Sequence, residues 1–594
     1  MEISMNKFSF ILLLGLSCSA GADAAPHEAN QASATDVTLL LNAKVFTMDE
    51  ARPWAQAIAI HDGKIMAIGS NEEVQQAAGE TRHASVHDLA GRFVMPGFID
   101  SHTHPGVIGL TSPAGAKADH PMTGEDDMLP DAAPDELLAW LKGYGNRHPG
   151  PILGLGIWNV EKYLPDGPNR AALDAIFPDR PVILNDNSGH SFWLNSAALN
   201  MLGINKKTPD LSKDLSMFAR DKQGEPTGWV KEFAIIDQTM KPLTQDSKRI
   251  KANILEFLRF LSAHGVTTVF DAGNLSAADA VYAAVRDLDR AGELPVRYEA
   301  TLHVYKPGQL KTVVADLKRL KRRYESPHLH INTVKIHLDG VTEIGTAAML
   351  APYAVGGGRG GLLFDAPRLA RLLAELDREG MDLHVHAVGD RAVRTTLDAV
   401  ETAQKTKGAA LKSRVTITHI EFVDPQDLPR FAALGVYANL TPHWFGGDQS
   451  RSANAIMVGE PRASHRNMAR SIVDAGAKVT FSSDVIEWDE IQRSNPFVGI
   501  QMGMTRQEYT GDAHSPVSIP ADQVCDLQTM IRGYTIDGAQ QLNMAEHVGA
   551  LKLGYDADLM VFDGNPLETD TYKIHGLMPT AVMMGGKVFS GKLN

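Results

Sequence analysis

Histidine pairs stand near the ends of two apolar, strand-like runs of the sequence. The run 93–102 ends in His102 and is followed by His104, and the run 382–386 carries His384 and His386. Residues i and i+2 of a strand point to the same face, so each pair presents two imidazoles together. Neutral imidazole nitrogens are good ligands for zinc, iron and manganese. The spacing therefore suggests metal chemistry.

Single polar residues end two further runs. His419 lies near the end of 415–422, and Asp484 directly follows 478–483. If the strands form a parallel barrel, their carboxyl ends meet on one face, which is where barrel enzymes hold their sites. Histidine and aspartate from four strand ends would then converge. We expect a divalent metal there, zinc before manganese or iron, with one or two ions per chain.

The run 331–338 contributes Lys335, with His337 and Asp339 on the same face. An ammonium group cannot bind a metal, so one interpretation is an ion pair between Lys335 and Asp339. In the other, burial beside cations lowers the pKa of the lysine amine. The free amine could then add carbon dioxide and form a carbamate whose oxygens bridge two metals. The residues alone leave both interpretations open.

The elements that must position these residues alternate along the middle of the chain. Strands are expected at 93–102, 266–271, 296–304, 331–338, 382–386, 415–422, 436–440 and 478–483. Helical patterns fall between most of them, at 250–263, 277–291, 310–324, 367–378, 392–404 and 466–475. This alternation predicts an α/β fold with a parallel (β/α)8 barrel of the TIM type. An open, doubly wound sheet is the alternative.

Short β runs occupy both ends of the chain and are absent from the middle. We expect residues 36–94 and 545–594 to form one small composite β-sandwich domain, and residues 95–544 to form the barrel. About 160 residues separate the first two barrel strands, far more than one β–α unit needs. Residues 105–247 are therefore expected to form an insertion over the mouth of the barrel, as a candidate lid.

The N-terminus has the pattern of a secretory signal peptide. Lys7 precedes the apolar run 8–16, and small residues follow up to Ala24. The apolar run is too short to span a bilayer, which needs about 20 residues. We expect residues 1–24 to be removed and the mature protein to be secreted, in the periplasm, without membrane insertion.

Composition narrows the function classes. The chain of 594 residues has 22% charged and 44% hydrophobic residues and a net charge of -14, which excludes disordered and collagen-like classes. Diffuse negative charge argues against a nucleic-acid partner, and the basic run 318–323 is interpreted as a solvated helix face. Two cysteines, Cys18 and Cys525, exclude disulfide scaffolds and cysteine-rich zinc modules. We expect a small-molecule substrate, and a homodimer is one assembly open to the chain.

The stretch 94–104, which reads Val-Met-Pro-Gly-Phe-Ile-Asp-Ser-His-Thr-His, resembles the opening signature of the metal-dependent amidohydrolase superfamily. A finer resemblance is to the branch of N-substituted formamide deformylase-like proteins (amidohydrolase 3). The segments that carry it are 173–182, 189–199, 335–340, 386–392, 418–419, 483–484 and 549–559.

This resemblance implies a set of site residues. The implied metal ligands are His102, His104, His386, His419 and Asp484, with Lys335 as a carboxylated bridge. His386 is preferred to His384 because it directly precedes Ala-Val-Gly-Asp at 387–390. Asp484 would also be the general base that takes the proton of the attacking water.

The implied activity is that of a secreted metal-dependent hydrolase that cleaves a non-peptide C–N bond. Amides, formamides, carbamates, ureas and cyclic amides are the candidate substrates. A lactone or ester hydrolase on the same site is one alternative, and a non-catalytic exported binding or regulatory protein is the other.

Two stretches at the predicted mouth depart from the family pattern. Residues 341–345 read Val-Thr-Glu-Ile-Gly where many relatives carry serine and arginine, and 439–444 read Asn-Leu-Thr-Pro-His-Trp where Gln-Pro is commoner. Substrate specificity is what these departures affect. A partly aromatic, partly polar pocket is expected, with candidate substrate contacts at Trp158, His190, Trp193, Glu343, His443 and Trp444.

Overall fold

A computed structural model describes residues 37–79, 84–112, 133–186, 188–447 and 451–593. The expected signal peptide, residues 1–24, lies outside these ranges and stays a prediction. Within them, no helix combines the length and the apolar composition needed to cross a membrane.

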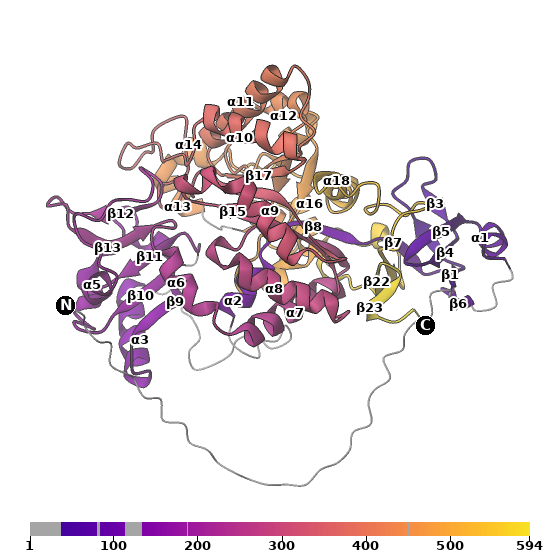
Figure 1. The fold of residues 1–594 in the computed structure, drawn as a ribbon, viewed down its shortest axis with the longest axis horizontal. Coiled ribbons are helices and arrows are strands. Elements are labelled where there is room, and N and C mark those ends of the chain that lie inside the picture. Colours follow the sequence, from indigo (N-terminus) through magenta and orange to yellow (C-terminus); the bar gives the residue numbers. More distant parts are fainter. Residues whose placement is uncertain (1–36, 80–83, 113–132, 187, 448–450, 594) are drawn as a thin grey trace, which may run out of the picture.

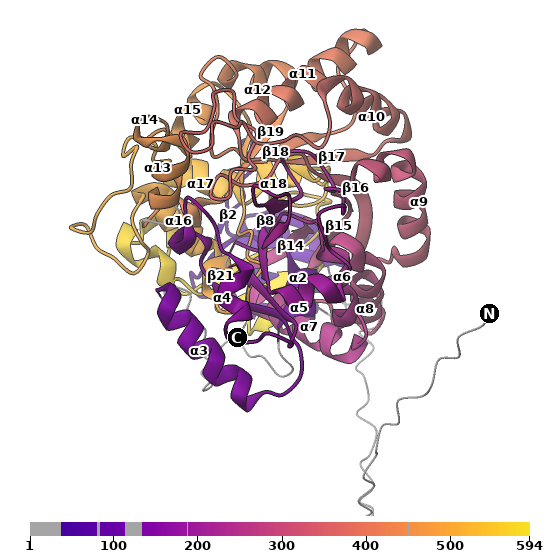
Figure 2. The same cartoon turned by 90° about the vertical axis from the view of Figure 1, so that its left-hand side faces the viewer.

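Eight parallel strands form the centre of the molecule (Figure 2). In spatial order they are β8 (Phe98–Thr103), β14 (Val266–Asp271), β15 (Arg297–Val304), β16 (Leu329–His337), β17 (Asp382–Ala387), β18 (Val415–His419), β19 (Tyr437–Leu440) and β20 (Val479–Phe481). The ring closes between β20 and β8, where the Ser101 hydroxyl donates to the Phe481 carbonyl at 2.8 Å and the Asp484 N–H donates to the His102 carbonyl at 2.9 Å. The expected (β/α)8 barrel is confirmed.

Helices surround this ring (Figure 2). They are α7 (Ser247–Ala263), α8 (Ala278–Arg290), α9 (Val313–Tyr324), α10 (Ala366–Glu379), α11 (Asp390–Lys407), α12 (Leu428–Leu434), α13 (Arg451–Val458), α14 (Glu460–Ala463), α15 (Ala469–Asp474), α16 (Pro496–Thr505), α17 (Leu527–Gly533) and α18 (Ile536–Gln541). Helix α10 illustrates their local logic: Asp365 caps its first turn by accepting the Arg368 N–H, and Gly380 ends it in the left-handed conformation. The basic run 318–323 lies on α9, where Lys318 pairs with Glu379 at 2.6 Å.

The first expected strand, 93–102, is two strands in two different sheets. Strand β7 (Phe93–Pro96) belongs to a sheet at the chain ends, and β8 belongs to the barrel. Gly97 separates them, and a Cβ atom there would come within 2.3 Å of the Thr267 side chain. Both strands are buried, so the sequence shows one continuous apolar run. The run does not reveal that its two halves pair with different sheets.

Two sheets occupy the end of the molecule opposite the insertion (Figure 1). The six-stranded sheet joins both chain ends in the order β23 (Lys587–Gly591), β22 (Ala581–Met584), β21 (Leu559–Phe562), β7, β2 (Lys44–Phe46) and β3 (Trp54–Ala55). The four-stranded sheet is N-terminal only, with β5 (Lys64–Gly69), β4 (Ala57–His61), β1 (Val37–Leu41) and β6 (Ala84–Asp88), and α1 (Asn71–Ala78) follows β5. The boundaries 36–94 and 545–594 stay predictions.

The insertion after β8 has its own five-stranded sheet (Figure 1). Its strands, in spatial order, are β12 (Met217–Arg220), β13 (Pro226–Lys231), β11 (Ser191–Leu194), β10 (Val182–Asp186) and β9 (Ile152–Trp158). Its helices are α2 (Pro105–Thr111), α3 (Pro134–Arg147), α4 (Arg170–Asp174), α5 (Ser196–Met201) and α6 (Ile236–Leu243), with a 3-10 turn at Val160–Tyr163. The end of this sheet meets the barrel mouth.

A buried ion pair fastens the chain-end sheet to the barrel. Arg297, at the start of β15, donates to both carboxylate oxygens of Asp558 at 2.8 and 3.1 Å, and the Gly585 N–H donates to the same carboxylate at 2.7 Å. Both charged side chains are buried. Asp556 also lies 3.1 Å from this guanidinium, so Arg297 has two carboxylate partners, of which Asp558 is the more deeply buried.

Asp558→Asn is therefore expected to lower the free energy of unfolding by about 1.5–3 kcal/mol, because the buried Arg297 guanidinium loses its two hydrogen bonds to a charged acceptor and keeps Asp556, at 3.1 Å, as its remaining carboxylate partner. Urea unfolding, with thermal melting as a second measure, tests this. The control is Glu568→Gln, which removes the exposed partner of Lys44 and should cost at most about 1 kcal/mol. Equal effects of the two substitutions would contradict the fastening role.

Candidate metal centre and its cavity

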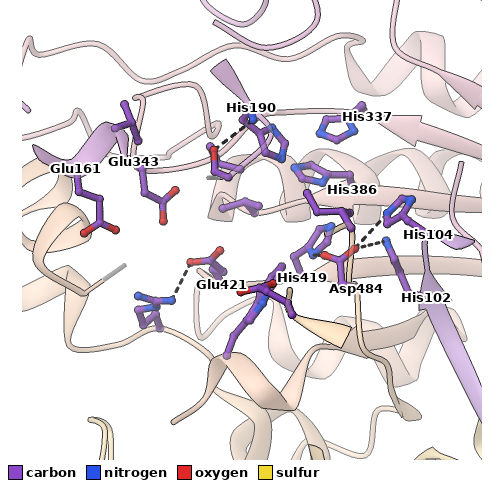
Figure 3. A pocket seen from close by; sticks show the side chains of 18 of the residues that line it. His102, His104, Glu161, His190, His337, Glu343, His386, His419, Glu421 and Asp484 are labelled. Carbon is purple, nitrogen blue, oxygen red and sulfur yellow. Dashed lines mark hydrogen bonds and ion pairs between the residues drawn. The ribbon is translucent and has the colours of Figure 1, made fainter. Parts of the chain in front are cut away.

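A cavity of about 590 Å³ opens over the carboxyl ends of the barrel strands (Figure 3). All six residues expected to hold metal line it: His102, His104, Lys335, His386, His419 and Asp484. They come from β8, β16, β17 and β18 and from the positions just after β8 and β20. The barrel therefore brings together side chains that are up to 382 residues apart in sequence, as the difference between 484 and 102 shows.

Three imidazoles surround the Asp484 carboxylate. The Nε2 atoms of His102 and His104 each lie 3.2 Å from its Oδ1 atom, and His419 Nδ1 lies 3.4 Å from its Oδ2 atom. Burial by itself would raise the pKa of Asp484, but positive charge on the neighbouring imidazoles holds it well below its usual value, and where those rings are neutral a bound cation must supply that charge. The carboxylate is thus ionised and available as a ligand.

Hydrogen bonds fix which nitrogen of His104 and His102 carries the proton. His104 Nδ1 faces the Gly273 carbonyl at 3.2 Å and so must be the donor. His102 Nδ1 lies 2.9 Å from both the Thr418 hydroxyl and His384 Nε2; because Thr418 donates its own hydrogen to Asn439 Oδ1 at 2.7 Å, Nδ1 is the donor and its hydrogen lies between Thr418 and His384. The Nε2 atoms of both rings therefore turn lone pairs toward Asp484.

This arrangement of acceptors needs a cation. Two imidazole lone pairs and a carboxylate oxygen at 3.2 Å repel one another unless positive charge lies between them. His419 Nδ1 is in addition a buried nitrogen with no hydrogen-bond partner among the described residues. Burial, together with Lys335, lowers the pKa of His102 to about 3, so its ring is neutral. The donor set of neutral imidazole and carboxylate fits a divalent metal.

His384 and His386 have different tasks. His384 Nε2 lies 2.9 Å from His102 Nδ1, on the side of that ring away from Asp484, and His384 does not line the cavity. His386 lines the cavity, its Nε2 donates to the Gly340 carbonyl at 3.3 Å, and its Nδ1 is left as the lone-pair nitrogen. Of the two histidines, His386 thus faces the cavity and His384 supports His102, and His386 as the metal ligand stays a prediction.

Lys335 is buried against His102. Its Nζ atom lies 3.4 Å from His102 Nε2, and burial lowers the pKa of its amine to about 7. Asp339, the alternative ion-pair partner, instead accepts the backbone N–H groups of Ala348, Val388 and Gly389 at 2.8 to 3.0 Å. The Asp339 carboxylate therefore organises the loops around β16 and β17.

A family model described as "Amidohydrolase family" (Amidohydro_3) matches residues 85–589. The chain belongs to the amidohydrolase family. It is 27% identical to the exoenzymes regulatory protein AepA of Pectobacterium carotovorum over 76% of this chain and 94% of that one. It is 25% identical to the N-substituted formamide deformylase of Arthrobacter pascens over 92% of this chain and 97% of that one.

A solved structure shares the fold. The crystal structure of an uncharacterized metal-dependent hydrolase from Pyrococcus horikoshii OT3 superposes with a TM-score of 0.63 at 23% identity, covering 90% of this chain and 99% of that one. Taken with the family membership, the chain is a metal-dependent hydrolase that acts on non-peptide C–N bonds.

Three of the six expected substrate contacts of this amidohydrolase line its cavity: His190, Glu343 and Trp444. His190 Nδ1 lies 2.7 Å from Glu232 Oε2, and burial opposes its protonation, yet Glu232 and the nearby Asp186 and Glu343 raise the pKa of His190 to about 9. Trp444 stacks on the ring of His419, with 5.5 Å between ring centroids.

The other three candidates do not line the cavity. Trp158 and Trp193 pack edge to face at 5.8 Å in an apolar cluster of the insertion, where both side chains are buried. His443 lies behind Trp444, edge-on at 5.9 Å. Trp158 and Trp193 belong to strands of the insertion, as expected, but large aromatic side chains there fill the core of the insertion sheet and do not reach the cavity surface.

Sequence reasoning missed several residues of the cavity wall. Glu421 and Arg466, which form a buried ion pair at 3.5 Å, are 45 residues apart, the difference of 466 and 421, and no pattern links them. Glu161 belongs to the turn after β9. His303 could have been found, because it stands near the end of β15 as His102 does in β8.

Thr418→Val is expected to weaken metal binding about 10- to 100-fold, because the Nδ1–H of His102 loses one of its two partners and keeps His384 Nε2, at 2.9 Å, to orient the ring. Competition with a coloured chelator measures the affinity. The matched control is Thr416→Val, the same exchange two residues earlier on β18. If both variants bind metal like the original protein, the hydroxyl does not orient His102.

Proposed function

We propose that this amidohydrolase hydrolyses small N-substituted amides at the metal centre, with N-substituted formamides as the first substrates to test. The observation that carries the proposal is the convergence of the His102 and His104 lone pairs on the ionised Asp484 carboxylate at 3.2 Å. The 25% identical relative named as an N-substituted formamide deformylase supports this choice of substrate. Other amides, carbamates, ureas and cyclic amides have the same scissile group.

The proposed metal is zinc, with manganese or iron as substitutes, held by His102, His104, His386, His419 and Asp484. When bound, such a metal polarises the substrate carbonyl and lowers the pKa of water toward neutrality. The protein's own contribution is rigid orientation, since the Gly273, Gly340 and Thr418 oxygens fix the ligand rings.

Asp484 is the proposed general base. Its carboxylate accepts a proton from the attacking water and delivers it to the leaving nitrogen, which departs as a neutral amine. The walls of the cavity, with Trp444 against His419, limit access of further water to this carboxylate.

Lys335 is proposed to act as a carbamate. Its neutral amine attacks the carbon of carbon dioxide, an N–C bond forms, one proton leaves the nitrogen, and the product carries one negative charge. The burial of Lys335 and its distance of 3.4 Å to His102 Nε2 support this role, because an anionic oxygen there would face the metal ligands.

Export to the periplasm completes the proposal and rests on the signal-peptide pattern at residues 1–24. The relative named as an exoenzymes regulatory protein favours a second candidate, an exported regulator without turnover. The retention of all six expected ligand residues around one cavity favours the enzyme.

The metal-loaded protein is expected to release amine from N-substituted formamides, and Asp484→Asn to lower kcat/KM by about 10²- to 10⁴-fold through loss of the general base. Amine release is measured before and after chelator treatment, and metal per chain by elemental analysis after incubation with bicarbonate and zinc. Two metals per chain support a bridged pair of ions, and one confines Lys335 to a structural role. Absence of both metal and turnover would favour the regulator.

Lys335→Ala should lose activity together with metal, and short carboxylates such as acetate or propionate should restore part of both, because they can supply the bridging oxygens. Activity is measured against carboxylate concentration, with Lys321→Ala, a half-buried lysine of α9 outside the cavity, as the matched control. Intact metal content without any rescue would count against the carbamate.

A further inference from the structure

The cavity has a second wall, opposite the metal centre, that carries carboxylates. Figure 3 shows Glu161, Glu343 and Glu421 on one side and Asp484 with its imidazoles on the other. Glu490 lines the same cavity. None of these four glutamates is among the expected metal ligands, so the proposed metal chemistry does not explain why they line the cavity.

The charges of this wall do not balance. Arg466 is engaged with Glu421 at 3.5 Å, and His190 is engaged with Glu232 at 2.7 Å. Lys162, the other lysine or arginine of the wall, is exposed. Two engaged pairs and one exposed lysine face the carboxylates of Glu343 and Glu490, so this part of the wall has an excess of negative charge.

The excess of negative charge is least favourable at Glu343. Glu343 is 7% exposed, its carboxylate lines the cavity, and within the described ranges no lysine, arginine or histidine nitrogen lies within the 4.0 Å of an ion pair with it. Its cationic neighbour His190 is already paired with Glu232, and a buried carboxylate with no cation in contact is unfavourable unless one arrives with the ligand.

The surroundings hold Glu343 in place. It lies in the loop after β16, where the Gly345 N–H donates to the Thr342 carbonyl at 3.0 Å and the Thr346 hydroxyl donates to Glu232 at 2.5 Å. Lys231, at the end of β13 in the insertion, donates instead to the Ile344 carbonyl at 2.7 Å. Lys231 therefore bonds to the backbone of this loop and not to the Glu343 carboxylate, which faces the cavity.

We propose that this wall binds a positively charged nitrogen of the substrate, a primary ammonium or a guanidinium, with Glu343 as its carboxylate partner. The substrates are then N-acyl derivatives of amines that carry a second, cationic nitrogen at the other end. The inference rests on the proposed function, since it assumes that the acyl group is the part that meets the metal centre.

The alternative use of this region, a further metal site, is less suited to the geometry. The ligand atoms of His190, Glu232 and His337 lie within 4.8 Å of one another. However, the hydrogen bond between His190 and Glu232 already joins two of these three groups. Glu343 is not part of this set.

The test compares mono-N-formyl diaminoalkanes with N-formyl alkylamines of equal length, over a series of increasing chain length. The cationic members are expected to have kcat/KM at least about tenfold higher at their best length, and Glu343→Gln to remove most of that preference. Glu343→Lys should shift the preference toward N-formyl amino acids with a terminal carboxylate. A control, Glu546→Gln, changes an exposed glutamate outside the cavity and should keep the original preference.

Binding is measured separately, so that the inference is decided without turnover. Calorimetry with mono-N-acetyl diaminoalkanes and N-acetyl alkylamines should give about tenfold tighter binding of the cation, lost in Glu343→Gln. Turnover of both substrate types at equal rates, with equal binding, overturns the inference and leaves the hydrolase intact. Selective cation binding without turnover of any formamide overturns the proposed reaction and supports the cationic site.

Discussion

The position of one proton, on Nδ1 of His102, is the constraint on which the metal centre depends. Ser101 donates to the Phe481 carbonyl, so its oxygen accepts from the Asn439 amide at 2.9 Å. The amide oxygen of Asn439 is thereby turned toward Thr418 and accepts the hydrogen of its hydroxyl. The Thr418 oxygen then presents a lone pair to His102 Nδ1. This series of hydrogen bonds starts at Ser101, where β20 and β8 close the barrel. Closure of the barrel therefore also sets the direction of the His102 lone pair.

Two of the expected ligands have strained backbone angles. His419 has φ 75° and Asp484 has φ 51°, a region that non-glycine residues seldom adopt. Such positions cost about 1–3 kcal/mol each and persist only where the surroundings determine them. Here the Asp484 N–H donates to the His102 carbonyl at 2.9 Å, and the Ile420 N–H donates to the Ala387 carbonyl at 3.1 Å. Neighbouring strands thus hold each turned residue.

The sequence predicted the barrel and the metal end of the cavity because both follow local rules. Apolar runs mark buried parallel strands, and the i, i+2 rule sets His102 and His104 on one face. The rules failed where tertiary partners decide. Gly97 ends one strand only because β7 and β8 pair with different sheets, and Trp158 is buried because the insertion has a core of its own. The ion pair of Glu421 with Arg466 has no periodic signal at all.

Two different parts of the chain build the two ends of the cavity, and they meet through Glu232. The strand ends of the barrel supply the metal end, whereas the turn after β9, His190 and the loop after β16, beside Glu421, Arg466 and Glu490 of the barrel, supply the opposite wall. Glu232, just after β13, binds His190 on the insertion and Thr346 on the barrel loop, and a Cβ at Gly340 would come within 2.0 Å of it. Because this contact docks the insertion without using a metal ligand, the distal wall can change its charge while the reaction centre keeps its geometry. Selectivity for the substrate is then a property of the insertion and its docking loop, and the chemistry is a property of the barrel.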